Sequence, residues 1–525
     1  MSYYSLMVKS SMDNNDKSNF GVALIRPPIV QLPMSLSCYG ATLPIGLAYI
    51  GAALESQGYR VTAVDAAGEA LTQIRSFDSP VGKLDRLGLN SKEIVARVPA
   101  DVKVVGITNM FLHEWPEVLE ILEELKRELP EALLVLGGEN ASAFWPQIFS
   151  MTDLVDAVVV GEGEETVVEL VNAVANGKSF SGVPGVVWRD EEGQVVEECT
   201  RARVRAVDGI APPAWHLFPI EAYLEADDMY GVDRGRAIPV LGSRGCPYVC
   251  TFCSSPQMWQ PKYIPRSPVD LVSEISGYVS KYGVQNINFC DLTAITKRKW
   301  IIEFCELMIE ADLGVVWQLP TGTRSEVLDR PVLELLYKAG CRNITYNPES
   351  GSERILEIYK KRVNIEKLLN SLESAEDTGL NTRVCFIVGH PKERFGDLIS
   401  STKLIAKMAL GGVHDVSVMM FSPFPGSEDF NEMSAAGEIE FGPNFYYLAL
   451  ARGGASRQGF HPTISNRKLV TAQWSMMLMF YSLSYASHPA RIFQSAKAFA
   501  SGEEETALDQ FLRIKARQFQ RLIQI

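Results

Sequence analysis

The chain is 525 residues long, and its composition of 46% hydrophobic and 22% charged residues is sufficient to build large hydrophobic cores. These values exclude a disordered chain, a collagen-like chain and a small scaffold that depends on disulfides. The formal net charge of −13 argues against general electrostatic binding of nucleic acid.

The N-terminal residues do not combine a basic start, an apolar stretch and a small-residue cleavage site, so the sequence predicts a cytoplasmic protein. The nine cysteines are then expected to be reduced thiols, and clustered cysteines become candidates for metal or redox sites. The most apolar segment, residues 474–486, is too short and too rich in serine to span a bilayer. We therefore expect no membrane span, and a helix there that is buried or touches a membrane.

Short apolar runs alternate with helical periods from residue 20 to residue 180. Runs that are apolar throughout and separated by helices are typical of a parallel sheet covered on both faces. The sequence therefore predicts a doubly wound α/β domain here, with strands at residues 22–25, 61–64, 102–107, 133–136 and 157–160.

Polar or glycine-rich loops follow the last three of these predicted strands. They are Thr108-Asn109, Gly137-Gly138-Glu139 and Gly161-Glu162-Gly163-Glu164. Tight turns with helix caps would explain any single loop. Three such loops at the carboxyl edge of one parallel sheet predict a binding site, because ligands approach bare backbone there. None matches the G-x-G-x-x-G fingerprint, which disfavours a nicotinamide or flavin.

Residues 181–236 are predicted to be a linker, with a hairpin near residues 186–196 and a proline-rich connector at residues 211–215. Residues 237–430 resume the alternation with six β/α units in series, which predicts a full or partial barrel with its active site at the carboxyl ends of the strands. Residues 431–525 are predicted to be mainly helical and to cover the mouth of this barrel.

Three cysteines with C-x3-C-x2-C spacing directly follow the first predicted strand of the barrel. Cys246, Cys250 and Cys253 can ligate three irons of a [4Fe–4S] cluster. The fourth iron then keeps an open coordination position, which suits substrate chemistry better than simple electron transfer. A structural zinc site would need four ligands in two close pairs, and no matching pair is present. Coincidental spacing is the third interpretation.

With Phe252 before its last cysteine, this motif resembles that of the radical S-adenosylmethionine superfamily, and segments 323–326, 347–352, 389–391 and 424–427 strengthen the match. The resemblance implies that the open iron binds the amino and carboxylate groups of S-adenosylmethionine, whose cleavage gives a 5′-deoxyadenosyl radical. The usual Gly-Gly-Glu amine-binding motif is not evident, and Asp291 stands at that place. By resemblance, S-adenosylmethionine is expected to contact Phe252, Arg324, Glu349 and Gly389.

The first domain resembles the cobalamin-binding domain of one large branch of this superfamily. The Asp-x-His-x-x-Gly motif of classical cobalamin domains is absent, as in the cobalamin radical enzymes that this chain resembles, so no lower axial histidine is implied. His113 follows the third strand and is either a cobalt-facing or a surface histidine. By resemblance, cobalamin is expected to contact Thr108, Gly137, Gly138, Glu139, Gly161, Glu162 and Gly163.

The resemblance therefore implies an α/β enzyme with a doubly wound cobalamin-binding domain, a partial (β/α)6 barrel and a helical C-terminal region. Its cofactors would be a [4Fe–4S] cluster, S-adenosylmethionine and cobalamin, and its partners a small-molecule substrate and an electron donor such as flavodoxin or ferredoxin. Methylation of an unactivated carbon is the first functional hypothesis. Cyclisation or rearrangement without methyl transfer is the alternative.

Two further classes are disfavoured by the cysteines. A cobalamin-sensing module without turnover would not need the three-cysteine loop, and a methylthiotransferase would carry a second cysteine set in the first domain, which has only Cys38. The sequence does not assign the general acid or base, the substrate or the oligomeric state. His390 and Glu393 are candidates to reach the pocket, and Tyr446 and Tyr447 are candidates to contact substrate, each weighed against a structural role.

Overall fold

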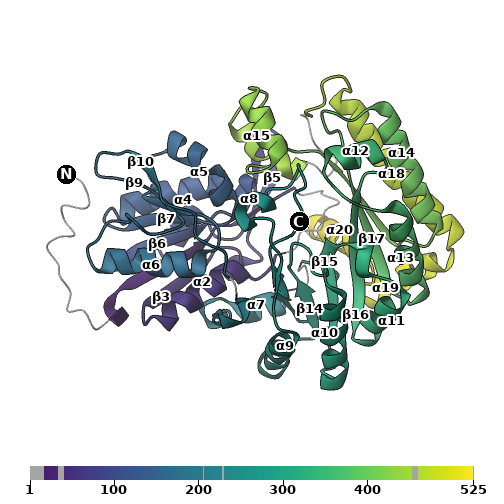
Figure 1. Cartoon of the computed structure of the whole chain (residues 1–525), viewed down its shortest axis with the longest axis horizontal. Coiled ribbons are helices and arrows are strands. Elements are labelled where there is room, and N and C mark those ends of the chain that lie inside the picture. The colour runs from purple at the N-terminus through teal and green to yellow at the C-terminus, as the bar shows by residue number, and fades with distance from the viewer. Residues whose placement is uncertain (1–16, 33–40, 205, 227–229, 452–458, 524–525) are drawn as a thin grey trace.

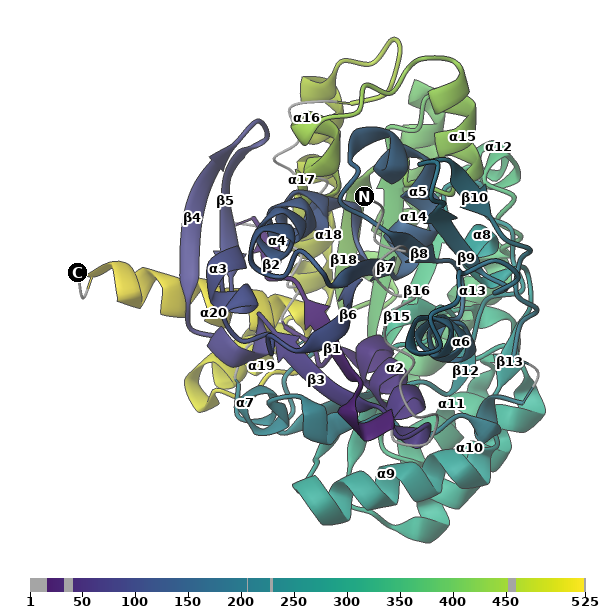
Figure 2. The ribbon, with the colours of Figure 1, turned by 90° about the vertical axis from the view of Figure 1, so that its left-hand side faces the viewer.

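The computed structural model describes residues 17–32, 41–204, 206–226, 230–451 and 459–523. Two mainly parallel sheets lie beside one another, each covered by helices, and helices of the C-terminal region pack on the second (Figure 1). Figure 2, turned so that the left-hand side of Figure 1 faces the viewer, shows the first domain in front of the barrel.

The first sheet has seven strands in the order β10-β9-β8-β7-β6-β1-β3, and its strands β1, β3, β6, β7 and β8 run parallel, as predicted for a doubly wound domain. The hairpin that we assigned to the linker instead extends this sheet, with β9 pairing antiparallel to β8. Its residues 186–188 are buried, so the hairpin completes the core. The strands are β1 (Gly21–Arg26), β3 (Arg60–Asp65), β6 (Val102–Thr108), β7 (Leu133–Gly137), β8 (Ala157–Val159), β9 (Val186–Arg189) and β10 (Val195–Glu197).

Helices cover both faces of this sheet. One face carries α2 (Ile45–Ser56) and α6 (Gly163–Ala175), and the other carries α3 (Ser91–Val95), α4 (Trp115–Glu128) and α5 (Glu139–Met151). A small antiparallel sheet that the sequence analysis missed orders its strands β2-β5-β4. Its strand β4 buries no residue, so it lacks the apolar run that marks the other strands. These strands are β2 (Ile29–Gln31), β4 (Ile74–Ser79) and β5 (Gly82–Leu87).

The second sheet has six parallel strands in chain order, which confirms the predicted partial barrel. The strands are β11 (Ala237–Val240), β14 (Asn286–Phe289), β15 (Val316–Thr323), β16 (Cys341–Glu349), β17 (Asn381–Val388) and β18 (Asp415–Met420). The accompanying helices are α9 (Pro268–Tyr282), α10 (Arg298–Ala311), α11 (Arg330–Lys338), α12 (Glu353–Ile358), α13 (Ile365–Asp377) and α14 (Phe395–Leu410), and the connection from the first domain contains α7 (Ile220–Leu224).

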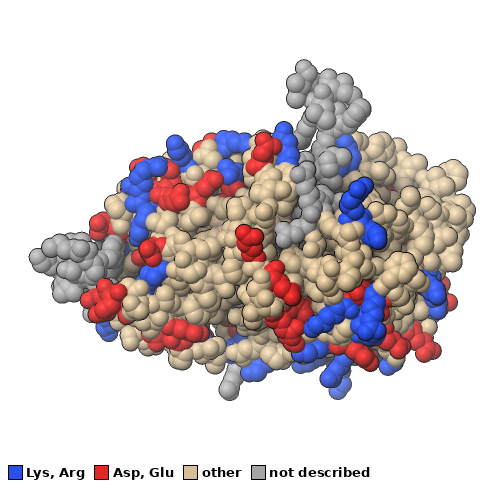
Figure 3. Space-filling model, turned by 90° about the horizontal axis from the view of Figure 1, so that it is seen from above, with Lys and Arg blue, Asp and Glu red and all other residues tan. Residues whose placement is uncertain are grey.

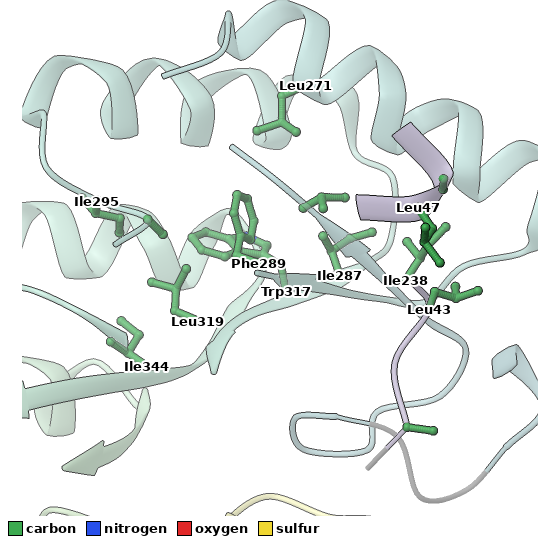
Figure 4. Close-up of a cluster of buried hydrophobic side chains, with 14 of the residues drawn as sticks. Leu43, Leu47, Ile238, Leu271, Ile287, Phe289, Ile295, Trp317, Leu319 and Ile344 are labelled. Carbon is green, nitrogen blue, oxygen red and sulfur yellow. The ribbon is translucent and has the colours of Figure 1, made fainter. Parts of the chain in front are cut away.

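The hydrophobic core is continuous across the two domains. Leu43 and Leu47 from the first domain lie in the same buried cluster as Ile238, Leu271 and Ile287 of the barrel (Figure 4). Burial of apolar surface at this junction stabilises the arrangement of the two sheets as well as the sheets themselves.

The two longest C-terminal helices pack on the side and on the amino end of the barrel, so the expectation that this region covers the barrel mouth is wrong for them. The Gln473 amide of α18 (Asn466–Ser487) donates to the Val418 carbonyl of β18 at 2.6 Å. The start of α20 (Ala507–Ile523) lies at the opposite end of the barrel, where the Ala507 N–H donates to the Asp415 carboxylate at 2.7 Å. The other helices here are α15 (Glu428–Ala435), α16 (Pro443–Tyr446), α17 (Leu448–Ala451) and α19 (Ala490–Ser501). None of the helices described has the length and hydropathy to cross a membrane.

Candidate active site between the two domains

A cavity of about 1750 Å³ lies between the carboxyl ends of the two sets of strands. From the barrel it is lined by Phe252, Cys253 and Glu349, among others. The carboxyl ends of the two sets of strands therefore open on the same cavity. From the first domain its lining includes Thr108, Gly137, Gly138, Glu139, Gly161, Glu162 and Gly163.

The two glycine loops contribute bare backbone to the first domain's side of the cavity. Gly138 precedes α5 with φ +105°, and a Cβ there would lie 2.8 Å from the Asn109 carbonyl oxygen. Gly161 has φ +85°, and the Met258 carbonyl is the nearest atom to a Cβ there, at 3.7 Å. Because side chains are disfavoured at these positions, the loops leave room for a broad ligand to approach the main chain. The residues present therefore fit the flat ring of a corrin.

The carboxylate of Glu162 joins the first domain to the barrel. Its Oε2 accepts from Arg203 Nε at 2.8 Å and from the Val204 N–H at 2.9 Å, and its Oε1 lies 3.4 Å from Arg244 Nη1. The side chains of Glu162 and both arginines are almost fully buried. Sequence reasoning missed Arg203 and Arg244, which lie 41 and 82 residues from Glu162 and carry no motif.

Glu139 also reaches across the cavity. Its carboxylate accepts a hydrogen bond from Ser254 Oγ, directly after Cys253, and burial raises the pKa of Glu139. The third acidic residue of the glycine loops, Glu164, pairs with Arg244 at 2.6 Å. All three carboxylates therefore contact protein groups outside the first sheet, which leaves the loop backbone for a ligand.

The three-cysteine loop runs between β12 (Ser243–Arg244), which pairs with β13 (Ile264–Pro265), and α8 (Ser255–Trp259). The Thr251 N–H donates to the Tyr359 carbonyl at 3.2 Å, and Thr251 Oγ1 donates to Asp429 Oδ2 at 3.1 Å. The Phe252 ring meets the Tyr359 ring edge-on, with 4.9 Å between the centroids. The loop is thus fixed at its centre, between Cys250 and Cys253.

The environment of the thiols fits a polynuclear cluster. Burial raises the pKa of all three cysteines, that of Cys253 to about 11, and the charges of Lys361 and Arg324 oppose the rise at Cys246 and Cys250. Each iron of a [4Fe–4S] cluster takes its own thiolate, so the three sulfurs need not converge on one point. Within the described residues no three His, Cys, Asp or Glu side chains converge as a mononuclear site requires.

A buried ion pair lies beside this loop. Lys361 Nζ is 2.9 Å from Glu349 Oε1, and both side chains are about one-tenth exposed or less. Glu349 ends β16 with φ +66°, a left-handed conformation that is costly for a residue with a side chain and that tends to occur at functional sites. An ammonium group already occupies this carboxylate, so the site is chemically suited to an amine. Sequence reasoning missed Lys361, which belongs to no recognisable motif.

Models of two protein families match this chain. The radical SAM superfamily model covers residues 240–405, and the B12-binding domain model covers residues 34–171. The chain belongs to the cobalamin-dependent radical SAM enzymes. Its cofactors are therefore a [4Fe–4S] cluster, S-adenosylmethionine and cobalamin.

Two curated relatives have different activities. The chain is 28% identical to the cytidylyl-2-hydroxyethylphosphonate methyltransferase of Streptomyces wedmorensis, over 78% of this chain and 82% of that protein. It is 29% identical to the anaerobic magnesium-protoporphyrin IX monomethyl ester cyclase of Rubrivivax gelatinosus, over 75% of this chain and 67% of that protein. Among solved structures, the methyltransferase TsrM from Kitasatospora setae shares the fold with a TM-score of 0.62 and 17% identity, covering 87% of this chain and 90% of that one.

Two residues predicted to contact S-adenosylmethionine lie outside the described lining of the large cavity. The Arg324 guanidinium stacks on Tyr248 at 3.8 Å from the ring centroid and pairs with Glu326 at 2.6 Å, so it lies against the cysteine loop. The Gly389 N–H donates to Glu393 Oε2 at 2.5 Å. The S-adenosylmethionine contacts of Arg324 and Gly389 remain predictions.

Asp291, at the place of the usual amine-binding motif, is fully buried. It accepts hydrogen bonds from the Gly242 N–H at 3.0 Å and from Ser243 Oγ, and burial raises its pKa to about 6. This carboxyl group supports the turn that leads into the radical SAM cysteine loop. Its printed contacts are those of a positioning residue.

The histidines and tyrosines weighed for the site have packing contacts. His390 is buried and lies 3.4 Å from Asp429, which also accepts from the cysteine loop. The His113 ring stacks on Phe111 with 5.4 Å between centroids, and it borders the cavity. Tyr446 packs on Phe144, and Tyr447 on Phe77, outside the described cavity lining. Aromatic packing is therefore what the structure gives for the two tyrosines.

Proposed function

We propose that this radical SAM enzyme is a methyltransferase that acts on an unactivated carbon of a small molecule. The observation that carries the proposal is the single cavity that joins the glycine loops, the cysteine loop and the interior of the barrel. Methyl transfer requires a methyl carrier and a radical-forming centre that share one substrate. The likeness to the Streptomyces wedmorensis methyltransferase, which extends over most of both chains, supports the same activity.

When bound, the cluster, S-adenosylmethionine and cobalamin supply hydrogen abstraction and a transferable methyl group. Cys246, Cys250 and Cys253 would hold the cluster, and the glycine loops of the first domain would hold the corrin through their backbone. Glu349 would accept a hydrogen bond from the amino group of S-adenosylmethionine, and its pairing with the ammonium group of Lys361 supports this role. The protein's own contribution is to orient these groups across one cavity and to exclude water.

The barrel interior supports a polar substrate. On β17, Asn381, Arg383 and Cys385 are half-buried and line the cavity, while the alternate residues Val384 and Val388 are fully buried and lie outside its described lining. The period of two follows from the pleat of the strand. A substrate that reaches these side chains would carry groups that hydrogen-bond to an amide and a guanidinium.

The amino end of the barrel is closed by the segment before α20. The side-chain amide of Asn343 donates to the Glu505 carbonyl at 2.9 Å, and Asp415 accepts from the N–H groups of Ala507 and Leu508. This closure limits the entry of water through the amino end of the barrel, which protects a radical from quenching. An external one-electron donor of the flavodoxin or ferredoxin kind completes the proposal.

Cyclisation or rearrangement without methyl transfer is the second candidate, because the Rubrivivax gelatinosus cyclase is as similar in sequence as the methyltransferase. The reaction products distinguish methyl transfer from cyclisation or rearrangement. The protein would be reconstituted anaerobically with iron, sulfide and cobalamin, reduced, and given S-adenosylmethionine with a labelled methyl group and cell extract. Methyl transfer predicts 5′-deoxyadenosine, S-adenosylhomocysteine and a labelled product heavier by one methylene. Production of 5′-deoxyadenosine without a labelled product would favour the second candidate.

A further inference from the structure

The outer faces of α14, α18 and α19 expose an unusual number of large apolar side chains. Phe395 and Leu478 are each 71% exposed and Phe493 is 78% exposed, although monomeric proteins rarely display such residues together. Figure 3 shows few charged side chains over the right-hand end of the molecule, where these helices lie in Figure 1. We call this surface the C-terminal apolar face; its exposed large side chains are Phe395, Ile399, Leu410, Trp474, Leu478, Ile492, Phe493 and Phe499.

The inner sides of these helices already supply the packing that the barrel needs. Leu469, Met476 and Phe480 of α18 are buried in the core, and α18 packs on both α14 and β18. Helix α18 is therefore apolar on its inner side and also on part of its outer side. A second apolar side is not needed for folding and indicates that another surface covers it.

The exposed charges on this face are all positive. Residues 395–411 and 466–502, all of them described, contain one acidic residue, Asp397, which is buried and pairs with Arg354. In a chain with a net charge of −13, this segregation is distinctive. Of the acidic residues that follow, Glu503 is exposed, Glu504 is buried, and Glu505 pairs with Arg234 at the amino end of the barrel. The exposed cations among the apolar side chains are Lys403, Lys407, Arg467, Lys468 and Lys497.

We propose that the C-terminal apolar face docks on the surface of a lipid bilayer that contains anionic lipids. Aromatic and aliphatic side chains would enter the boundary between headgroups and acyl chains, while the lysine side chains extend to the phosphates. Since no described helix is able to span a bilayer, the contact is peripheral. Self-association through this face is disfavoured because two copies would bring five cations of each chain together. The proposal does not depend on the reaction that the enzyme catalyses.

Co-sedimentation of the full chain with vesicles tests this proposal. We expect binding to vesicles of phosphatidylcholine and phosphatidylglycerol, weaker binding to phosphatidylcholine alone, and release by salt. The double variant Leu478→Glu/Phe493→Glu should lose at least about tenfold in affinity, since it removes two inserted side chains and adds two repelled charges. Both positions are mostly exposed, so the melting temperature should not change.

The matched control is Val269→Glu on α9, which is 56% exposed and lies on another part of the barrel. It should bind vesicles as the wild type does. A second variant, Lys403→Glu/Lys407→Glu, should lower the affinity for anionic vesicles and reduce the dependence on salt. Wild-type protein that stays in the supernatant with anionic vesicles would overturn the proposal. So would a dimer in sedimentation velocity that the Leu478→Glu/Phe493→Glu variant disperses, because the face would then belong to a second copy.

Discussion

The two edges of the cavity, which we call the first-domain rim and the barrel rim, present different chemical groups to it. The first domain presents backbone, through Gly138 and Gly161, and directs the acidic side chains of its loops to the barrel. The barrel presents side chains, among them the Cys253 thiol of the cysteine loop and the Glu349 carboxylate, which pairs with Lys361. A broad corrin ring requires space and shape, whereas iron and an amino acid group require charge and specific donors. The difference between the rims therefore follows the chemistry of what each one would hold.

We expect the largest effect from a variant of the barrel rim that lacks the three thiols. Replacing Cys246, Cys250 and Cys253 by alanine should abolish the visible charge-transfer absorption of the reconstituted protein and all cleavage of S-adenosylmethionine, because no ligand to iron remains. Cobalamin binding by the first domain should persist, and absorption spectroscopy separates the two signals. Cys199→Ala, at an exposed position, is the matched control and should behave as wild type. Normal cleavage by the triple variant would contradict the radical assignment.

Glu162→Gln breaks the connection between the rims. Removing one partner of a buried ion pair leaves uncompensated charge on Arg203 and Arg244, so we expect a loss of about 3 kcal/mol in the free energy of unfolding, measured with denaturant. The control Glu169→Gln removes a partly exposed partner of Arg201 and should cost about 0–1 kcal/mol. Equal losses in the two variants would show that the Glu162 cluster does not hold the domains.

A change of pH should act on a buried carboxyl near each rim. Burial raises the pKa of Glu393 from 4.5 to about 7, and that of Glu114 likewise. Between pH 4.5 and about pH 7 each of these carboxyl groups is protonated in the folded state and ionised in the unfolded state. The folded state therefore binds more protons, and the free energy of unfolding falls as pH rises. We expect Glu393→Gln to reduce this fall between pH 5 and 8 by about 2 kcal/mol. Identical pH profiles for variant and wild type, from denaturant titrations, would contradict the burial of an acidic Glu393.

Gly138→Ala tests the backbone character of the first rim. A side chain at φ +105° that lies 2.8 Å from the Asn109 oxygen should cost about 1–2 kcal/mol and weaken cobalamin binding in absorption titrations. Gly277→Ala is the matched control, since it lies inside α9 with no atom within 4 Å of the new Cβ, and it should be neutral or slightly stabilising. Unchanged cobalamin affinity in Gly138→Ala would shift the ligand away from this loop.

The elements that sequence periodicity predicts are those with continuous apolar runs. All six barrel strands and the five parallel strands of the first sheet follow from such runs, and the cysteine loop follows from spacing alone. The partners of Glu162 and Glu349 do not, because Arg203, Arg244 and Lys361 approach them only after folding. The strand β4 escaped detection because it buries nothing, and the placement of α18 and α20 depends on which barrel surfaces the other elements leave open.

The continuous core and the Glu162 cluster also bear on how this molecule can be divided. A boundary drawn between the two family matches would separate Leu43 and Leu47 from Ile238, and Glu162 from Arg244. The first domain expressed alone would thus expose apolar surface and a buried charge. Heating should unfold both domains in a single cooperative transition. A chimaera made from two relatives would need to take both sides of the interface between the domains from the same parent.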